Sequence, residues 1–304
     1  MDFIELSQEM SVPQVGLGCM RMHALTEKEA SKVIGCAMEE GIAFFDHADI
    51  YGEGESERRF AQGRKLLGIP RDKMILQTKC GIHKGFYDLS RDAIVQSVEG
   101  SLKRLKTDYL DILLLHRPDA LTEPEEVAEA FDLLHTSGKV RYFGVSNHNP
   151  GQVEWLKTAV RQPLRVNQLQ FSPAHTGLID CGLDVNMKTE QAVHRDGMVL
   201  NYCQYQNMVI QAWSPFQYGQ IEGVFFDNPA FADLTGTIRK IASQKMISDS
   251  SVVINWILLC PGKVQAIVGT MNPERLAGIC RGLEKPLDRK EWYEIYTSAG
   301  NPLP

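Results

Sequence analysis

The 304-residue sequence has no excess of basic residues and no long hydrophobic run. Its 32 lysines and arginines are outnumbered by 38 aspartates and glutamates, and the formal net charge is −6. Nucleic-acid binding needs clustered lysine and arginine, so we predict no nucleic-acid partner. The longest apolar run, Val252 to Cys260, is interrupted by Asn255 and is far shorter than the roughly 20 residues of a membrane span. We therefore predict no membrane association.

The sequence also lacks paired cysteines and a basic N-terminus. Its seven cysteines are scattered, with no C-x-x-C pair of the kind that zinc sites and redox centres use. We therefore expect reduced thiols, which are typical of a cytoplasmic protein. The acidic start Met1–Glu5 differs from the basic start of a signal peptide, and it favours the same cytoplasmic location.

No linker rich in proline, glycine or serine and no low-complexity tract divides the chain. Hydrophobic residues make up 43% and charged residues 23% of the sequence, which is typical of globular enzymes. The length fits either two domains or one α/β barrel with extensions. We expect a single domain over residues 1–304, with an N-terminal segment at 1–14 and a C-terminal extension at 284–304.

Eight short apolar runs alternate with amphipathic stretches at a steady spacing. The runs are nearly continuous in apolar residues, as is typical of parallel strands buried on both faces. This alternation predicts a closed (β/α)₈ TIM barrel of the α/β class rather than its rival, an open doubly wound sheet. The predicted strands are Val15–Cys19, Ala43–Asp46, Met74–Lys79, Leu110–Leu115, Tyr142–Ser146, Val166–Gln170, Ile210–Trp213 and Gln265–Val268.

Helix-capping residues precede several of the amphipathic stretches. The predicted helix starts carry Thr26 with Glu29, Ser90, Thr122 with Glu125, and Asn272 followed by Pro273. Two connections are longer than usual, one from Phe171 to about Asp184 and one from Ser214 to about Phe231. Because connections that follow barrel strands lie on the active face, we expect these two to be lids over a ligand.

Four polar side chains fall at or just after the ends of three consecutive predicted strands: Asp46, Tyr51, Lys79 and His116. Adjacent parallel strands deliver their C-terminal ends side by side, so these groups should meet at one rim. A tyrosine has a pKa of about 10, and a neighbouring Lys79 cation, held by Asp46, is expected to lower it. Tyr51 would then exchange a proton with an oxygen atom that His116 orients.

A carbonyl that receives a proton on oxygen needs a hydride on carbon, which implies a nicotinamide or a flavin. The dinucleotide fingerprint G-x-G-x-x-G is missing, because Arg21 and Glu57 stand where the third glycine would be. Other strand ends offer groups that fit a dinucleotide. These are Ser146, Asn147 and Gln168 for a carboxamide, Trp213 for a flat ring, Ser214 for a phosphate, and Thr270 with Arg275 for an adenosine phosphate.

Seven segments resemble the aldo-keto reductase family, in the family's order, over about residues 12–283. The sequence GIAFFDHADIYG at 41–52 is similar to that family's signature G-x-x-x-F-D-T-A-x-x-Y-G. The other segments are QTK at 77–79, LLLH at 113–116, GVSN at 144–147, NQ at 167–168, AWSP at 212–215 and PERL at 273–276. Within the family the resemblance is to bacterial reductases of the YdhF type.

The resemblance implies a barrel that binds NADP(H) across its active rim and reduces the carbonyl of a small aldehyde or ketone. It implies Tyr51 as the general acid, with Asp46, Lys79 and His116 completing a catalytic tetrad. The implied cofactor contacts are Cys19, Met20, Arg21, Ser146, Asn147, Gln168, Trp213, Ser214, Pro215, Phe216, Gly269, Thr270 and Arg275. The expected substrate pocket is lined by Met22, His47, Phe86, Tyr87 and His148.

Three positions depart from the family pattern. His47 replaces the threonine of the signature, Gly269 replaces a lysine near the adenosine phosphate, and Ile279 replaces an adenine-contacting asparagine. The change at Gly269 keeps NAD(H) open beside NADP(H).

Two other functions stay as alternatives. A metal-dependent hydrolase would use Asp46, His47, Asp49, His116 and His148, although no H-x-H or H-E-x-x-H spacing exists and Lys79 would repel a cation. The other alternative is a regulatory or structural barrel that binds cofactor without turnover, against which the intact tetrad argues. No sequence feature predicts the oligomeric state or the physiological substrate.

Overall fold

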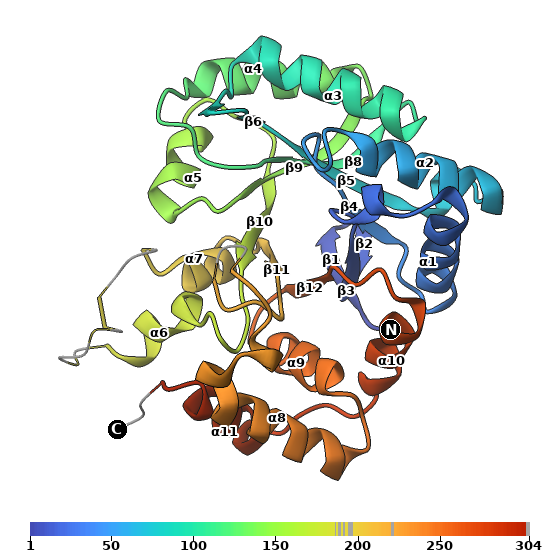
Figure 1. Cartoon of the computed structure of the whole chain (residues 1–304). Coiled ribbons are helices and arrows are strands. Elements are labelled where there is room, and N and C mark those ends of the chain that lie inside the picture. Colours follow the sequence, from blue (N-terminus) through green and yellow to red (C-terminus); the bar gives the residue numbers. More distant parts are fainter. Residues whose placement is uncertain (186, 188–189, 191, 194–196, 220–221, 302–304) are drawn as a thin grey trace.

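The computed structural model describes all residues except 186, 188, 189, 191, 194–196, 220, 221 and 302–304. Eight parallel strands close into a barrel, and helices pack around it (Figure 1). Each of the eight predicted strands is confirmed, and closure excludes the open sheet. In barrel order the strands are β3 (Val15–Gly18), β4 (Phe44–Asp46), β5 (Ile75–Cys80), β8 (Leu110–Leu115), β9 (Val140–Ser146), β10 (Leu164–Gln170), β11 (Val209–Trp213) and β12 (Val264–Val268).

The helices bury an apolar stripe against the outside of the barrel, which makes the main core. Short 3₁₀ turns lie at Met22–Ala24, Arg71–Lys73, Phe225–Asp227 and Pro229–Phe231. The α-helices are α1 (Glu27–Glu39), α2 (Glu55–Leu67), α3 (Arg91–Leu105), α4 (Pro124–Thr136), α5 (Pro150–Lys157), α6 (Gly177–Leu183), α7 (Val199–Tyr205), α8 (Ala232–Lys245), α9 (Asp249–Leu258), α10 (Pro273–Gly282) and α11 (Arg289–Ser298).

Three of the four predicted helix starts are confirmed. Thr26 and Glu29 form a reciprocal capping box at α1, Ser90 caps α3, and Asn272 caps α10. The prediction at Thr122 is wrong, because α4 begins only at Pro124 and Thr122 makes no cap. Its hydroxyl donates instead to the carbonyl of Asp119 at 2.8 Å, which closes a turn before the helix.

The N-terminal segment forms a hairpin, β1 (Phe3–Ser7) and β2 (Met10–Pro13), that closes one end of the barrel. Leu6 and Val12 join a buried apolar cluster inside the barrel with side chains such as Phe44 and Ile112. A second hairpin, β6 (Ile82–His83) and β7 (Phe86–Tyr87), follows β5. The open end of the barrel is therefore the one where the strands finish.

The C-terminal extension is anchored by aromatic stacking. The rings of Trp256 on α9 and Trp292 on α11 are 5.0 Å apart at an interplanar angle of 6°. Each indole N–H donates to the other residue's carbonyl at 3.0 Å. This pairing fixes α11 across the helices that follow the seventh strand.

The two predicted long connections contain α6 after β10 and two 3₁₀ turns after β11, and α7 lies farther along the chain, before β11. Residues 220 and 221 of the second connection lie outside the described residues, and the role of both connections as lids stays a prediction. Cysteines with described side chains are free thiols, and the Cys181 side chain lies outside the described set. Among the described residues, no helix combines the length and the apolar character that a membrane crossing needs.

Candidate active site

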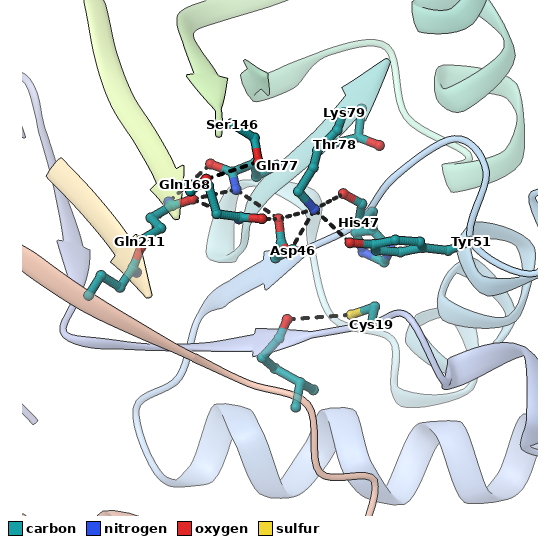
Figure 2. Close-up of polar contacts among 12 residues, drawn as sticks. Cys19, Asp46, His47, Tyr51, Gln77, Thr78, Lys79, Ser146, Gln168 and Gln211 are labelled. Carbon is teal, nitrogen blue, oxygen red and sulfur yellow. Dashed lines mark hydrogen bonds and ion pairs between the residues drawn. The ribbon is translucent and has the colours of Figure 1, made fainter. Parts of the chain in front are cut away.

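Asp46, Lys79 and Tyr51 meet at the open end of the barrel (Figure 2). Lys79 Nζ donates to both carboxylate oxygens of Asp46, at 2.8 and 2.9 Å, and to the His47 carbonyl at 2.7 Å. It also lies 3.0 Å from Tyr51 Oη. Lys79 is 0% exposed. The ammonium therefore has four oxygen atoms around it and no access to water.

The barrel register explains why these groups meet. Asp46 ends β4 and pairs with Gln77 of β5. Lys79 lies two residues beyond Gln77 on β5. Because the side chains of a strand alternate, the Gln77 and Lys79 side chains point to the same side of the strand. The parallel strands β4 and β5 therefore bring the Asp46 carboxylate and the Lys79 ammonium close together inside the barrel.

A tight turn brings Tyr51 to Lys79. The Tyr51 amide donates to the Ala48 carbonyl at 3.1 Å, and the Tyr51 carbonyl accepts from Ser56 N at 3.2 Å. Gly52 has a φ of 56°, and a Cβ there would lie 2.6 Å from the His23 ring. The turn thus requires glycine directly after the tyrosine.

A second buried ion pair holds the segment that follows this turn. Glu57 is 0% exposed and accepts from Arg104 Nε of α3 at 2.6 Å. Its other oxygen accepts from Thr78 Oγ1 of β5 at 2.8 Å. The start of α2 is thereby fastened to the strand that carries Lys79. Sequence reasoning did not assign this role to Glu57.

His116 lies against the tyrosine. The two ring centroids are 6.0 Å apart, and the planes are nearly perpendicular at 82°. The His116 amide donates to the Cys80 carbonyl at 2.8 Å, which continues the β5–β8 ladder. Burial, and then the Lys79 cation, lower the pKa of His116 well below its ordinary value. The imidazole is therefore neutral at physiological pH.

The electrostatics of the site contradict the prediction for the pKa of Tyr51. Enclosure of the Tyr51 phenol raises its pKa, and the neighbouring Lys79 cation only partly opposes this. The predicted net lowering of the tyrosine pKa is therefore wrong. Burial lowers the pKa of Lys79, but Asp46 and then Tyr51 outweigh it, and the net pKa is raised. The lysine is a cation and the tyrosine a neutral phenol at neutral pH.

Next to this cluster, the ends of β9, β10 and β11 hold the expected carboxamide-binding residues. Ser146 Oγ donates to the main-chain carbonyl of Gln168 at 3.0 Å and accepts from Asn147 Nδ2 at 2.8 Å. The Trp213 indole N–H donates to Asn147 Oδ1 at 3.2 Å. Asn147 and Ser214 have φ values of 58° and 50°. Left-handed backbone at non-glycine residues is often concentrated at functional sites.

The residues expected near an adenosine phosphate lie farther along the same face. Arg275 is exposed near the start of α10, and Thr270 is nearly buried with its Oγ1 accepting from Asn272 N at 3.2 Å. A cavity of about 430 Å³ lies between the starts of α9 and α10. Its lining residues are Ser248, Asp249, Ser250, Glu274, Arg275 and Gly278. Ile279 is buried in the core.

Three predicted contacts have no exposed surface: Cys19, Met22 and His47 are each 0% exposed. The Cys19 thiol donates to the Leu17 carbonyl at 3.6 Å, and Met22 packs in the main core. The His47 ring lies 4.7 Å from the Phe60 ring, between β4 and α2. Their placement at the cofactor or in the substrate pocket stays a prediction: Cys19 follows β3, Met22 lies in a 3₁₀ turn, and both pack in the core between the barrel and its helices.

The remaining predicted residues keep some surface or border the open end. Met20, Arg21, Phe86 and Tyr87 are exposed, and Phe216 and Gly269 are half-buried. Pro215 is buried. His148 is nearly buried, with Nδ1 2.9 Å from the Ser146 carbonyl, and burial lowers its pKa to about 4. Their contacts with cofactor or substrate stay predictions.

The hydrolase alternative meets a geometric obstacle. Within the described part of the chain, no group of three or more His, Cys, Asp or Glu side chains is placed to hold a metal ion. Asp46 is paired with Lys79, and the His47 ring faces Phe60 instead of Asp46. The residues that this alternative needs do not converge.

Two buried glutamines belong to the site and were not predicted. Gln77 donates to Asp46 Oδ1 at 2.7 Å, and it also donates to Gln211 Oε1 at 2.7 Å. A signal was present in the sequence for Gln211, which interrupts an otherwise apolar strand, whereas Gln77 stands in a polar run with Thr78 and Lys79. Their contact could not be predicted, since β5 and β11 lie on opposite sides of the barrel.

Comparison with known proteins agrees with this architecture. The sequence model of the Aldo/keto reductase family matches residues 14–298. The chain is 33% identical to the uncharacterized oxidoreductase YcsN of Bacillus subtilis (strain 168), over 98% of both chains. It is 34% identical to the oxidoreductase YdhF of Escherichia coli (strain K12), over 85% of this chain and 83% of that one.

A solved structure has the same fold. It is an aldo-keto reductase from Klebsiella pneumoniae in complex with NADPH, with a TM-score of 0.79 and 24% identity, over 100% of this chain and 96% of that one. The fold, together with the family model and the two bacterial relatives, defines a barrel of the oxidoreductase class. The chain belongs to the Aldo/keto reductase family.

Proposed function

We propose that this protein is an NADP(H)-dependent reductase that converts the carbonyl of a small aldehyde or ketone to an alcohol, with Tyr51 as its general acid. The observation that carries the proposal is the 3.0 Å contact between Tyr51 Oη and Lys79 Nζ, with Asp46 bound to the same ammonium. Family membership supports the reaction class, and the NADPH bound by the Klebsiella pneumoniae neighbour supports the cofactor.

The residues at the barrel rim suit a nicotinamide dinucleotide. Ser146 and Asn147 offer hydroxyl and amide groups at the end of β9, and Gln168 Oε1 is left to accept a hydrogen bond. Asn147 holds the Trp213 indole, which fixes the ring for stacking. Arg275, exposed on the 430 Å³ cavity, would pair with an adenosine phosphate. When bound, the reduced nicotinamide supplies a hydride to the substrate carbon.

Residues of the protein itself donate the proton and stabilise the charge that its loss leaves. Tyr51 carries its proton at neutral pH because its pKa is raised, so it can donate to the carbonyl oxygen. As the phenol loses that proton, the adjacent Lys79 cation stabilises the negative charge. Asp46 keeps the buried Lys79 charged. Neutral His116, beside Tyr51, is placed to hydrogen-bond the same oxygen and so orient the carbonyl.

The variant Tyr51→Phe tests the assignment, because it removes only the hydroxyl. We expect reduction of a panel of aldehydes and ketones to fall roughly 10²- to 10⁴-fold, the usual contribution of a general acid. NADPH binding, measured by quenching of tryptophan fluorescence, should stay within about twofold, because Tyr51 is not among the proposed cofactor contacts. Tyr205→Phe, at a residue that is 87% exposed, is the matched control.

Two results would change the conclusion. If Tyr51→Phe keeps most of its turnover, another group is the acid. If the unmodified protein binds NADPH but reduces nothing in the panel, the cofactor-binding barrel without turnover becomes the better description.

A further inference from the structure

A polar layer crosses the barrel interior beside Asp46. It consists of four glutamine side chains from four strands, each at most 3% exposed: Gln77, Gln168, Gln211 and Gln265. Such layers in a barrel are usually filled by branched apolar side chains. Gln168 pairs in register with Gln211, and Gln211 with Gln265. Gln77 reaches Gln211 from the opposite wall of the barrel.

Every amide N–H of three of these glutamines has an acceptor. Gln77 and Gln168 each donate to Asp46 Oδ1, at 2.7 and 3.2 Å. Each also donates to Gln211 Oε1, at 2.7 and 3.0 Å. Gln211 donates to Gln77 Oε1 at 3.0 Å and to Gln265 Oε1 at 2.9 Å. Since an amide nitrogen carries two protons, these three donors are fully used.

The direction of the network is fixed at both ends. The Asp46 carboxylate, bound to Lys79, only accepts hydrogen bonds, so Gln77 and Gln168 must present their NH₂ groups to it. At the far end, Gln265 donates to the Pro13 carbonyl at 2.7 Å, which also only accepts. Reversing either Gln77 or Gln211 would place two donors or two acceptors face to face. The amide orientations therefore follow from the chemistry of the ends.

The consequence falls on Gln168. Both protons of its side-chain nitrogen are directed to Asp46 and Gln211, so the side-chain oxygen Oε1 is the group left for a ligand (Figure 2). In the described structure no hydrogen bond reaches this oxygen, and it is not among the buried atoms that lack a partner.

We propose that Gln77 and Gln211 are positioning residues that fix the side-chain oxygen Oε1 of Gln168 toward the nicotinamide carboxamide, so that the site demands an N–H donor from the cofactor. This rests on the proposed function, because it assumes that the carboxamide binds at Gln168. Neither residue touches the cofactor. They act through the orientation of Gln168 and through the hydrogen bond to Asp46.

A cofactor analogue tests the orientation directly. In the 3-acetylpyridine analogue of NADP⁺ a methyl group replaces the carboxamide NH₂, so the donor that faces Gln168 is absent. We expect the unmodified protein to bind NADP⁺ roughly tenfold more tightly than the analogue, as measured by titration calorimetry. In Gln211→Met the Gln168 amide loses one of its two acceptors and keeps only the 3.2 Å bond to Asp46, so Oε1 is held less firmly in place and the preference should fall below about threefold.

Two further variants show the smallest and the largest preference for NADP⁺ over the analogue that we expect. Gln168→Leu should abolish the preference, because it removes the oxygen itself. Gln265→Met is the matched control: it makes the same change at the far end, where Gln77 and Gln168 still donate to Gln211, so the tenfold preference should remain. If Gln211→Met does not fold, Gln77→Met replaces it, because it frees Gln211 from the opposite wall.

The outcomes separate the two proposals. If Gln211→Met keeps the full preference that Gln168→Leu loses, or if the unmodified protein binds both nucleotides equally, Gln77 and Gln211 do not orient Gln168. If the unmodified protein binds neither nucleotide, the proposed function itself fails, and this inference fails with it.

Discussion

His47 makes the stability of the fold sensitive to acid. Its imidazole is 0% exposed, it packs against Phe60, and both ring nitrogens lack a hydrogen-bond partner among the described residues. Burial, and then the Lys79 cation nearby, lower the pKa of His47 to about 3. The folded protein therefore keeps this ring neutral, whereas the unfolded chain protonates it below about pH 6.5.

The sign and size of the effect follow from proton linkage. Between about pH 6.5 and the folded pKa of His47, the unfolded state binds one more proton than the folded state at this residue, so the free energy of unfolding falls as pH falls. Each pH unit in that window costs about 1.4 kcal/mol. From about pH 7 to about pH 5, His47 alone should remove about 2 kcal/mol.

The variant His47→Leu removes the titration while nearly conserving volume. We expect it to be at least as stable as the unmodified protein at about pH 7, because two unpaired polar atoms are replaced by apolar ones. Its loss of stability down to about pH 5 should be about 2 kcal/mol smaller than that of the unmodified protein. Urea unfolding at the two pH values, followed by fluorescence, measures both quantities.

The comparison isolates His47 from the other buried histidines. His116 and His148 also have lowered pKa values, and they contribute to acid sensitivity in both proteins equally. His83→Gln, at an exposed histidine, is the control for removing one imidazole and should lose as much as the unmodified protein. If His47→Leu also loses as much, the imidazole is protonated without cost and the reasoning is wrong.

Two further predictions concern the site and the barrel. The rate of carbonyl reduction should be constant between about pH 6 and about pH 8, because His116 is neutral and Tyr51 keeps its proton in that range. The rate should fall only at alkaline pH. A change in rate near about pH 6.5 that disappears in His116→Gln would contradict this prediction. Gly144→Ala should cost about 3 kcal/mol or more in urea unfolding, because its Cβ would lie 2.6 Å from the Val166 carbonyl oxygen. Gly236→Ala, with nothing within 4 Å, should instead gain about 0.5–1 kcal/mol, and equal effects would refute the packing argument.

Local signals in the sequence were sufficient for most of the framework. The capping box of Thr26 and Glu29 predicted the start of α1 because both partners lie within one helical turn. The prediction at Thr122 failed because the same residue types also close a turn, and the choice depends on where Pro124 can begin a helix. Strand ends were predicted to within two residues because buried parallel strands are continuous in apolar residues.

Contacts across the barrel and the degree of burial could not be predicted in the same way. His47 and Met22 are close in sequence to Asp46 and to the first strand end, but the sequence does not show that both residues are 0% exposed. Neighbours in sequence on a strand point to opposite sides, and the register of the strand decides which side is the interior. The pKa of Tyr51 was likewise misjudged, because a nearby charge can be inferred from motifs but the cost of enclosing the phenol cannot.

The amino-acid order alone determined the number of barrel strands, their alternation with helices, and the meeting of Asp46, Lys79 and Tyr51 at one end, because these depend on hydrophobic periodicity and on the parallel direction of neighbouring strands. Only closure of the barrel brought Gln77 opposite Gln211, since residues 134 positions apart touch through the packing of the whole cylinder. The orientation of the glutamine amides inside the barrel follows from their burial, because each buried amide must find acceptors for its N–H groups without water.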